Sequence, residues 1–255
     1  MPPFASYPSL SGRTVFVSGG GSGIGASIVE HFAAQGARVG FVDIDEASST
    51  ALVESIRAAG HPAPLFVPCD IRDVAAYQSA IEGVAAQLGT ITVLVNNAAR
   101  DDRHTIDQVT PDFWDERMAV NLRHAYFAIQ TVAPGMKKAG GGSVVNFSSV
   151  SYHTMTPNLS VYQAAKAAVI GMTRGLARDL GGDGIRLNAV TPGWIMTQRQ
   201  LDLWVTPEAK AAQLNAQCLK EMLYAPDIAR MVLWLASDDS RLVTAQNFVV
   251  DGGRV

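Results

Sequence analysis

Residues 14–25 read TVFVSGGGSGIG, and this stretch decides the fold. A short β-branched and apolar run breaks into glycines, and Ile28, Val29 and Phe32 then follow the spacing of an amphipathic helix. Glycines at 19, 23 and 25 permit a tight turn and a close approach to a pyrophosphate, which the amino end of the helix attracts. Their G-x-x-x-G-x-G spacing differs from the usual fingerprint, although residues 21, 23 and 26 fit the looser form ending in alanine. The stretch therefore predicts a dinucleotide site, with an unliganded glycine loop as the alternative.

The next strand-like segment, ARVGFVDID, favours the dinucleotide interpretation. It is apolar up to Asp43, about 20 residues beyond Gly23, where an acidic residue binds the adenosine ribose diol. A carboxylate there repels a 2′-phosphate, and the neighbouring Ser22 and Ile44 carry no positive charge to hold one. The sequence therefore favours NAD over NADP. A solvated strand end is the alternative for Asp43 only if the glycine loop is also discounted.

Strand-like and helix-like segments alternate along the chain without a linker, which predicts a single α/β domain. We expect strands near 14–18, 38–42, 65–69, 91–95, 143–147, 185–190 and 246–250. We expect helices near 24–35, 46–59, 73–88, 111–138, 160–180, 207–220 and 226–237. Pro134 should kink or divide the fourth helix. The polar motifs then follow the carboxyl ends of strands, where open α/β sheets bind ligands.

Three side chains form a candidate proton-transfer group: Ser149, Tyr162 and Lys166. Tyr162 and Lys166 lie four residues apart, on one face of a predicted helix, and Ser149 follows a predicted strand. A free phenol has a pKa of about 10 and is a poor base at neutral pH. An adjacent ammonium should favour the phenolate and lower that pKa. The group therefore suits removal of a proton from an alcohol, or its return to a carbonyl.

Composition excludes several other classes of protein. The chain has 255 residues, 48% of them hydrophobic, and a net charge of −3 with no basic run, which argues against a nucleic-acid surface. No stretch is long and apolar enough for a membrane span, and the start lacks the pattern of a signal peptide. We expect a cytoplasmic protein with a loose arm over residues 1–9 and one domain over residues 10–255. Two distant cysteines and unpaired histidines predict no metal site.

The motifs together resemble the short-chain dehydrogenase/reductase family from about Leu10 onward. The matching segments are SGGGSGIG (18–25), CDI (69–71), NNAA (96–99), VNLRH (120–124), NFSS (146–149), YQAAK (162–166), TPGWIMT (191–197) and VDGG (250–253). The resemblance implies a Rossmann-like, doubly wound sheet of seven mainly parallel strands with helices on both faces. It implies catalytic roles for Ser149, Tyr162 and Lys166, with Asn121 holding a water in a proton relay.

The resemblance also implies which residues hold the cofactor. Lys166 would bind the nicotinamide ribose, Asp70 the adenine, Asn96 the adenosine ribose side, and Ile195 and Thr197 the carboxamide and phosphates. The full implied set is Gly19, Ser22, Gly23, Ile24, Gly25, Asp43, Asp70, Ile71, Asn96, Ala98, Tyr162, Lys166, Pro192, Gly193, Ile195 and Thr197.

Segments outside the general family pattern resemble bacterial pentose 1-dehydrogenases, which oxidise D-xylose or L-arabinose to the lactone. These segments are DDRH (101–104), FWDERMAVNLRH (113–124), VAPGMKKAGGG (132–142) and the region 197–220. The candidate wall positions are rich in hydrogen-bonding groups, as a polyhydroxylated substrate requires, and a loop over about 193–207 is a candidate lid. The predicted substrate contacts are Ser149, Ser151, His153, Asn158, Tyr162, Trp194 and Gln198. For DDRH, a solvated surface loop is the alternative.

The sequence therefore predicts NAD-dependent oxidation of an aldose at C1, with Tyr162 as the general base. Two alternatives stay open: an NADP(H)-dependent reductase of an oxoacyl or other carbonyl substrate, and a non-catalytic dinucleotide sensor. The apolar tail strand NFVVDGGRV and the apolar residues Val169, Ile170, Met172 and Leu176 on one long helix also predict a homotetramer.

Overall fold

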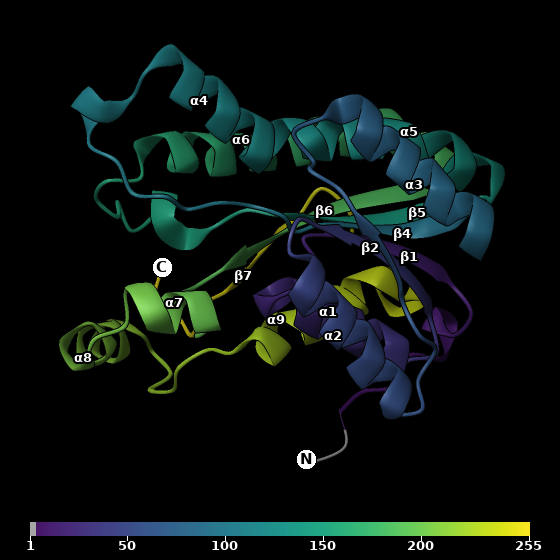
Figure 1. The fold of residues 1–255 in the computed structure, drawn as a ribbon, viewed down its shortest axis with the longest axis horizontal. Helices are drawn as coiled ribbons and strands as arrows, with labels where there is room; N and C mark the ends of the chain where they lie inside the picture. Colours follow the sequence, from purple (N-terminus) through teal and green to yellow (C-terminus); the bar gives the residue numbers. More distant parts are fainter. Residues whose placement is uncertain (1–3) are drawn as a thin grey trace.

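The computed structural model describes residues 4–255, and these form seven parallel strands with helices on both faces (Figure 1). The strands are β1 (Thr14–Ser18), β2 (Arg38–Asp43), β3 (Leu65–Pro68), β4 (Ile91–Asn96), β5 (Gly142–Phe147), β6 (Ile185–Pro192) and β7 (Asn247–Val250). The main helices are α1 (Gly23–Ala34), α2 (Glu46–Ala58), α3 (Val74–Leu88), α4 (Pro111–Met118), α5 (His124–Lys138), α6 (Ser160–Leu180), α7 (Gln198–Leu203), α8 (Pro207–Ala216) and α9 (Ala225–Ala236). The predicted doubly wound α/β fold is confirmed.

The strand order is β3-β2-β1-β4-β5-β6-β7, and every pairing is parallel. The order reverses between β1 and β4, and a reversal of this kind leaves a crevice beyond the carboxyl ends of the two strands. The fold thus places the glycine loop after β1 and the NNAA segment after β4 at the same point of the sheet edge.

Two apolar cores lie on the two faces of the sheet. Helices α1, α2 and α9 enclose one core, which includes Ile28, Phe32 and Leu235, and α3, α5 and α6 enclose the other, which includes Tyr77 and Ile129 (Figure 1). The central strands β1 and β4 contact both cores, and their near-continuous apolar sequence is typical of strands buried on both faces. No helix of residues 4–255 is long and apolar enough to cross a bilayer.

The long helix predicted over 111–138 differs from the structure in one respect. Pro134, predicted to kink or divide the helix, does not divide it, because α5 continues past Pro134 to Lys138. The irregularity lies at Ala119–Arg123, a π-helical turn in which the backbone N–H of His124 bonds to the carbonyl of Ala119. A proline removes only one backbone donor, whereas a π turn inserts a residue, and such turns often occur at functional sites.

Of the predicted N-terminal arm over residues 1–9, the structure describes residues 4–9. The first three residues of the arm lie outside the described range. Over residues 4–9, the backbone N–H of Tyr7 donates to Gln35 after α1 at 2.7 Å, and Phe4 lies under the guanidinium of Arg230 on α9. A short 3₁₀ turn, Pro8–Leu10, leads into the domain, and Leu10 is buried in the core.

Candidate active site

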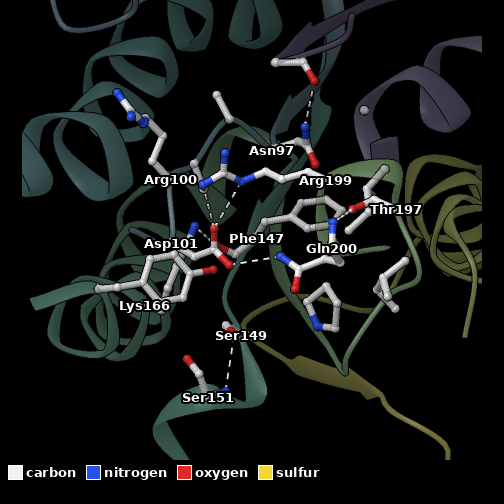
Figure 2. A pocket seen from close by; sticks show the side chains of 18 of the residues that line it. Asn97, Arg100, Asp101, Phe147, Ser149, Ser151, Lys166, Thr197, Arg199 and Gln200 are labelled. Carbon is white, nitrogen blue, oxygen red and sulfur yellow. Dashed lines mark hydrogen bonds and ion pairs between the residues drawn. The ribbon is translucent and has the colours of Figure 1, made fainter. Parts of the chain in front are cut away.

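A cavity of about 810 Å³ opens at the carboxyl edge of the sheet, at the reversal of strand order. Its wall comes from the loops after β1 to β6, from α6 and from the α7 region. Polar and charged side chains surround it, as Figure 2 shows for Asp101, Ser149, Lys166 and Gln200. This volume is within the usual range for small-molecule and cofactor sites.

The glycine turn between β1 and α1 has no room for side chains. A Cβ on Gly19, whose φ is +67°, would lie 2.9 Å from the Cα of Ala98. A Cβ on Gly25 would lie 1.8 Å from the carbonyl oxygen of Gly19 and 2.7 Å from Nδ2 of Asn97. The turn therefore presents backbone at the amino end of α1, where an anion is favoured. These residues fit the pyrophosphate of a dinucleotide.

Asp43 lies beside this turn with its carboxylate fixed by the backbone. Its Oδ2 accepts from the N–H of Gly21 at 2.8 Å and its Oδ1 from the N–H of Asp45 at 3.0 Å. Asp43 and the exposed Ile44 both line the cavity. Each carboxylate oxygen keeps a lone pair for a ribose hydroxyl.

Asp70 and Arg72 form a charged pair on the same part of the wall. The guanidinium of Arg72 donates to both oxygens of Asp70, at 2.6–3.0 Å, and to Glu116 at 2.9 Å. Hydrogen bonding to Arg72 holds the pKa of the Asp70 carboxyl below its usual value. Arg72 is a cavity residue that the sequence did not indicate. Its two carboxylate partners already engage its charge.

The predicted proton-transfer residues meet in the cavity wall. Ser149 follows β5, and Tyr162 and Lys166 come from α6. Lys166 is buried, and its Nζ donates to the carbonyl of Phe147 at 2.9 Å and lies 5.6 Å from the centre of the Tyr162 ring. Burial lowers the pKa of Lys166 to about 7.

The prediction that the pKa of Tyr162 is lowered is wrong in this structure. Burial raises the pKa of the phenol above its usual value, and the negative charge of Asp101 raises it further. A hydrogen bond with Ser149 and the positive charge of Arg103 act in the opposite direction. Desolvation disfavours the charged forms of both Tyr162 and Lys166, so burial outweighs the expected effect of the ammonium.

Asn121 lies in the π turn behind the cavity wall. Its side-chain amide accepts from the N–H of Arg100 at 2.9 Å and donates to the carbonyls of Arg100 and Arg117 at 3.1 and 2.9 Å. The side chain therefore braces the loop after β4. The proton-relay water stays a prediction. Because the side-chain amide of Asn121 is already hydrogen-bonded to the backbone, another group would have to bind that water.

Most predicted contacts line the cavity. Those that do are Gly19, Ser22, Ile24, Gly25, Asp43, Asp70, Ile71, Ala98, Ser149, Ser151, Tyr162, Lys166, Pro192, Gly193, Trp194, Ile195 and Thr197. The hydroxyl of Ser151 is buried and has no hydrogen-bond partner within residues 4–255, which leaves it free for a ligand.

Two predicted cofactor residues are not on the wall. Gly23 lies within the glycine turn, where a Cβ would meet Thr197 at 3.2 Å. The side chain of Asn96 is buried under the sheet edge and donates to Oδ1 of Asn146 at 2.8 Å. Asn97 lines the cavity in its place, and its Nδ2 donates to the carbonyl of Gly19 at 2.9 Å.

Three predicted substrate contacts are also elsewhere. The ring of His153 packs against the ring of Tyr152, with the centroids 4.0 Å apart and the planes tilted by 34°. The carbonyl of Asn158, a residue with φ of +60°, accepts from the N–H of His104. Gln198 is exposed and donates to Asp202 at 2.7 Å.

The structure adds two cavity residues from α7 that the sequence prediction missed, Arg199 and Gln200. Trp204 at the end of α7, a candidate aromatic face for a sugar in the sequence, also lines the cavity. A capping pattern at the start of α7 could have revealed the helix, because Thr197 is followed three residues later by Gln200 and its hydroxyl accepts from the Gln200 N–H.

The chain is similar to known proteins over nearly all of its length. Residues 19–254 match the family described as enoyl-(acyl carrier protein) reductase. The chain is 51% identical over 251 residues to the probable galactose dehydrogenase of Rhizobium meliloti, covering 98% of each chain. It is 49% identical over 249 residues to D-xylose 1-dehydrogenase of Caulobacter vibrioides, again covering 98% of each.

Solved structures are similar over the whole chain. A putative short-chain alcohol dehydrogenase from Sinorhizobium meliloti matches with a TM-score of 0.91 at 29% identity, covering 97% of this chain and 98% of the other. A blue fluorescent protein from a metagenomic library, in complex with NADPH, matches with a TM-score of 0.88 at 37% identity, covering 97% and 99%. The chain belongs to the short-chain dehydrogenase/reductase family, whose fold binds a nicotinamide dinucleotide.

Proposed function

We propose that this protein is an NAD-dependent aldose 1-dehydrogenase, with Tyr162 as the general base. The observation that carries the proposal is the meeting of Ser149, Tyr162 and Lys166 in the wall of a cavity that also carries polar and charged side chains. The relatives at 51% and 49% identity, a probable galactose dehydrogenase and a D-xylose 1-dehydrogenase, support a sugar substrate.

The chain's own residues supply the proton chemistry. The phenol oxygen of Tyr162 takes the proton of the anomeric hydroxyl, and the Ser149 hydroxyl donates a hydrogen bond to the same substrate oxygen. The bound nicotinamide supplies the hydride acceptor. The ammonium of Lys166 stabilises the phenolate and binds the nicotinamide ribose. Because burial lowers the pKa of Lys166 to about 7, small changes in its surroundings can change its charge.

The electrostatics of the adenosine end support NAD. Asp43 lines the cavity with its carboxylate fixed beside the glycine turn, where it repels a 2′-phosphate. The nearby Arg72 is held by Asp70 and Glu116, so it offers little free charge to a phosphate. The NADPH complex of a neighbour at 37% identity makes cofactor choice a necessary test.

The substrate prediction is a pentose, and galactose is a further candidate because of the first relative. L-Arabinose and D-galactose share the ring configuration from C2 to C4, whereas D-xylose has the opposite configuration at C4. A site that contacts the C4 hydroxyl would therefore discriminate between L-arabinose and D-xylose. A site that contacts only the C2 and C3 hydroxyls would accept both sugars.

The test is the initial rate of reduced-nicotinamide formation with these three sugars, each with NAD⁺ and NADP⁺. We expect turnover with at least one sugar, a higher kcat/KM with NAD⁺, and a lactone as the product. Asp43→Ala combined with Ile44→Arg should shift the preference towards NADP⁺, because it removes repulsion and supplies a cation. No turnover with any aldose would exclude the proposed activity, and a wild-type preference for NADP⁺ would exclude our interpretation of Asp43.

A further inference from the structure

Asp101 stands out among the cavity residues, because its carboxylate lies in the wall close enough to Tyr162 to act on the phenol. It comes from the loop after β4, which Asn121 braces through the backbone of Arg100. Figure 2 shows the carboxylate between the α7 side chains and the catalytic region. Its side chain is 22% exposed, so it is sheltered but open to a ligand.

A chain of hydrogen bonds orients this carboxylate. The indole N–H of Trp194 donates to Oε1 of Gln200 at 2.8 Å, and Nε2 of Gln200 donates to Oδ2 of Asp101 at 3.0 Å. Because the indole can only donate, it fixes which end of the Gln200 amide faces the carboxylate. The position of Asp101 therefore depends on α7, which lies within the candidate lid predicted over about 193–207.

The neighbouring Asp102 takes most of the surrounding positive charge. It pairs with Arg100 at 2.9 Å, with Arg199 at 3.0 Å, and with Arg117. Within residues 4–255, the ion pair of Asp101 is the one with Arg199, at 3.4 Å. Arg103, also on this wall, lies 5.0 Å from the Trp204 ring. Asp101 is thus the carboxylate whose acceptor capacity is left for a ligand.

This arrangement has a cost for the reaction, because a negative charge beside Tyr162 disfavours the phenolate that acts as the base. The charged groups near Tyr162 are of both signs. Asp101 and Arg103 come from the loop after β4, and Lys166 comes from α6. Tight binding of a polar substrate is a benefit that would offset the cost.

We propose that Asp101 determines substrate specificity by accepting hydrogen bonds from one or more of the sugar hydroxyl groups at C2 to C4, with Gln200 as the residue that positions it. The inference rests on the proposed aldose dehydrogenase activity and names the group that recognises the sugar. Carboxylates are strong acceptors for hydroxyls, and a site built to bond a hydroxyl discriminates strongly against an analogue that lacks it.

The first test is Asp101→Asn, which keeps the size of the side chain and removes its charge. We expect KM for the preferred aldose to rise at least tenfold, with the affinity for the nicotinamide cofactor unchanged. Asp202→Asn is the matched control, because Asp202 is an exposed carboxylate on α7 whose partner is Gln198, outside the cavity. The control should keep wild-type KM.

The second test uses aldoses that lack one hydroxyl, at C2, C3 or C4. The wild type should lose at least tenfold in kcat/KM for one of them relative to the parent sugar. Asp101→Asn should reduce that discrimination to about threefold or less, and Gln200→Leu should reduce it in the same direction. Unchanged discrimination in Asp101→Asn would overturn the proposal.

The pH profile separates recognition from a purely structural effect. Asp101 raises the pKa of Tyr162, so its neutralisation should move the rise of kcat/KM to lower pH, which Asp202→Asn should not do. An unshifted profile together with unchanged KM would contradict the role. If Asp101→Asn fails to fold, Gln200→Leu with the deoxy sugars decides. Failure of the proposed function is a different result, because the wild type itself would then oxidise no aldose.

Discussion

Tyr162 and Lys166 share one physical condition, which is that burial favours the neutral form of each. The pKa of the tyrosine lies above its usual value, and that of the lysine falls to about 7. Near neutral pH the charge of Lys166 can therefore change with small changes in its surroundings, such as ligands bound in the cavity, whereas Tyr162 stays protonated unless its own surroundings change. Groups with such shifts are typical of functional sites.

Tyr162→Phe tests the role of the phenol oxygen. The change removes one hydroxyl from the wall, so we expect kcat to fall by about 10²–10⁴-fold, the usual contribution of a general base. Cofactor affinity, measured by calorimetric titration, should stay within about threefold of the wild type. Near-normal turnover in this variant would contradict the assignment.

Lys166→Met tests how the burial of Lys166 affects the free energy of unfolding at different pH values. An unfolded lysine titrates near 10.4, and the folded one near 7, so between these values the unfolded chain binds a proton that the folded protein has released. Stability from this group must then rise with pH over that window, by at most about 1.4 kcal/mol per pH unit.

The measurement is the free energy of urea unfolding at pH 7 and pH 9, at one protein concentration. The wild type should gain stability relative to Lys166→Met as the pH rises. Lys210→Met, at an exposed lysine of α8, is the control and should show no such trend. An equal pH dependence in wild type and Lys166→Met would mean that Lys166 titrates normally in the folded protein.

At the scale of single elements, the glycine turn and α1 set the position of the cofactor. Gly25→Ala would place a Cβ 1.8 Å from the carbonyl of Gly19, so the backbone of the turn must move. We expect loss of cofactor affinity by at least tenfold in calorimetric titration. Gly83→Ala on α3 is a matched control, because its Cβ meets nothing within 4 Å. It should keep cofactor affinity and raise stability by up to about 1 kcal/mol. Equal affinity in both variants would mean that the turn does not carry the pyrophosphate.

Elements with a strong periodic pattern could be predicted from the sequence, whereas α7 has no such pattern and is marked only by the capping residue Thr197 at its start. Helix α6 starts and ends at the predicted residues, because its apolar side chains repeat at helical spacing over 21 residues. Helix α7 has six residues, none of them buried, so it carries no such signal. Gln200 and Arg199 were missed for this reason, although they contact Asp101.

Choosing between neighbouring residues at a strand end also exceeds what the sequence can decide. Asn96 and Asn97 are consecutive, and successive side chains of a strand point to opposite faces. The sequence identified the segment, but its last strand position, Asn96, turns to Asn146, while Asn97 faces the cavity. For Tyr162, the sequence predicted a neighbouring ammonium that should lower the pKa of the phenol, but it could not show the depth of burial that raises this pKa.

At the scale of the whole molecule, the reversal of strand order brings distant segments to one cavity. The glycine turn, Ser149 and α7 are far apart in sequence and line the same cavity, and Figure 2 shows Ser149 with Arg199 and Gln200 of α7. The tail strand β7 forms one edge of the sheet, with Val249 40% exposed, and Trp114 and Tyr126 are exposed on α4 and α5.

We expect these surfaces to be covered in a homotetramer. One part of the sequence argument is weaker in the structure, because Val169 is buried and Met172 and Leu176 pack against the core. The prediction now rests on β7 and on the exposed aromatics of α4 and α5. Light scattering at micromolar concentration should give about four times the chain mass of 27.1 kDa. A mass of one chain would contradict the predicted tetramer. A stable dimer would mean that only one of the two surfaces, β7 or the exposed aromatics of α4 and α5, forms a contact between subunits.

Transfer of the hydrogen at C1 is the central claim, and isotopic labelling measures it directly. The enzyme is supplied with NAD⁺ and with an aldose that carries deuterium at C1, and the reduced cofactor is analysed by mass spectrometry. The account predicts one deuterium in the reduced nicotinamide, a lactone as the sugar product, and loss of both in Tyr162→Phe. Deuterium retained in the sugar, with reduced cofactor still formed, would show that oxidation occurs at another carbon.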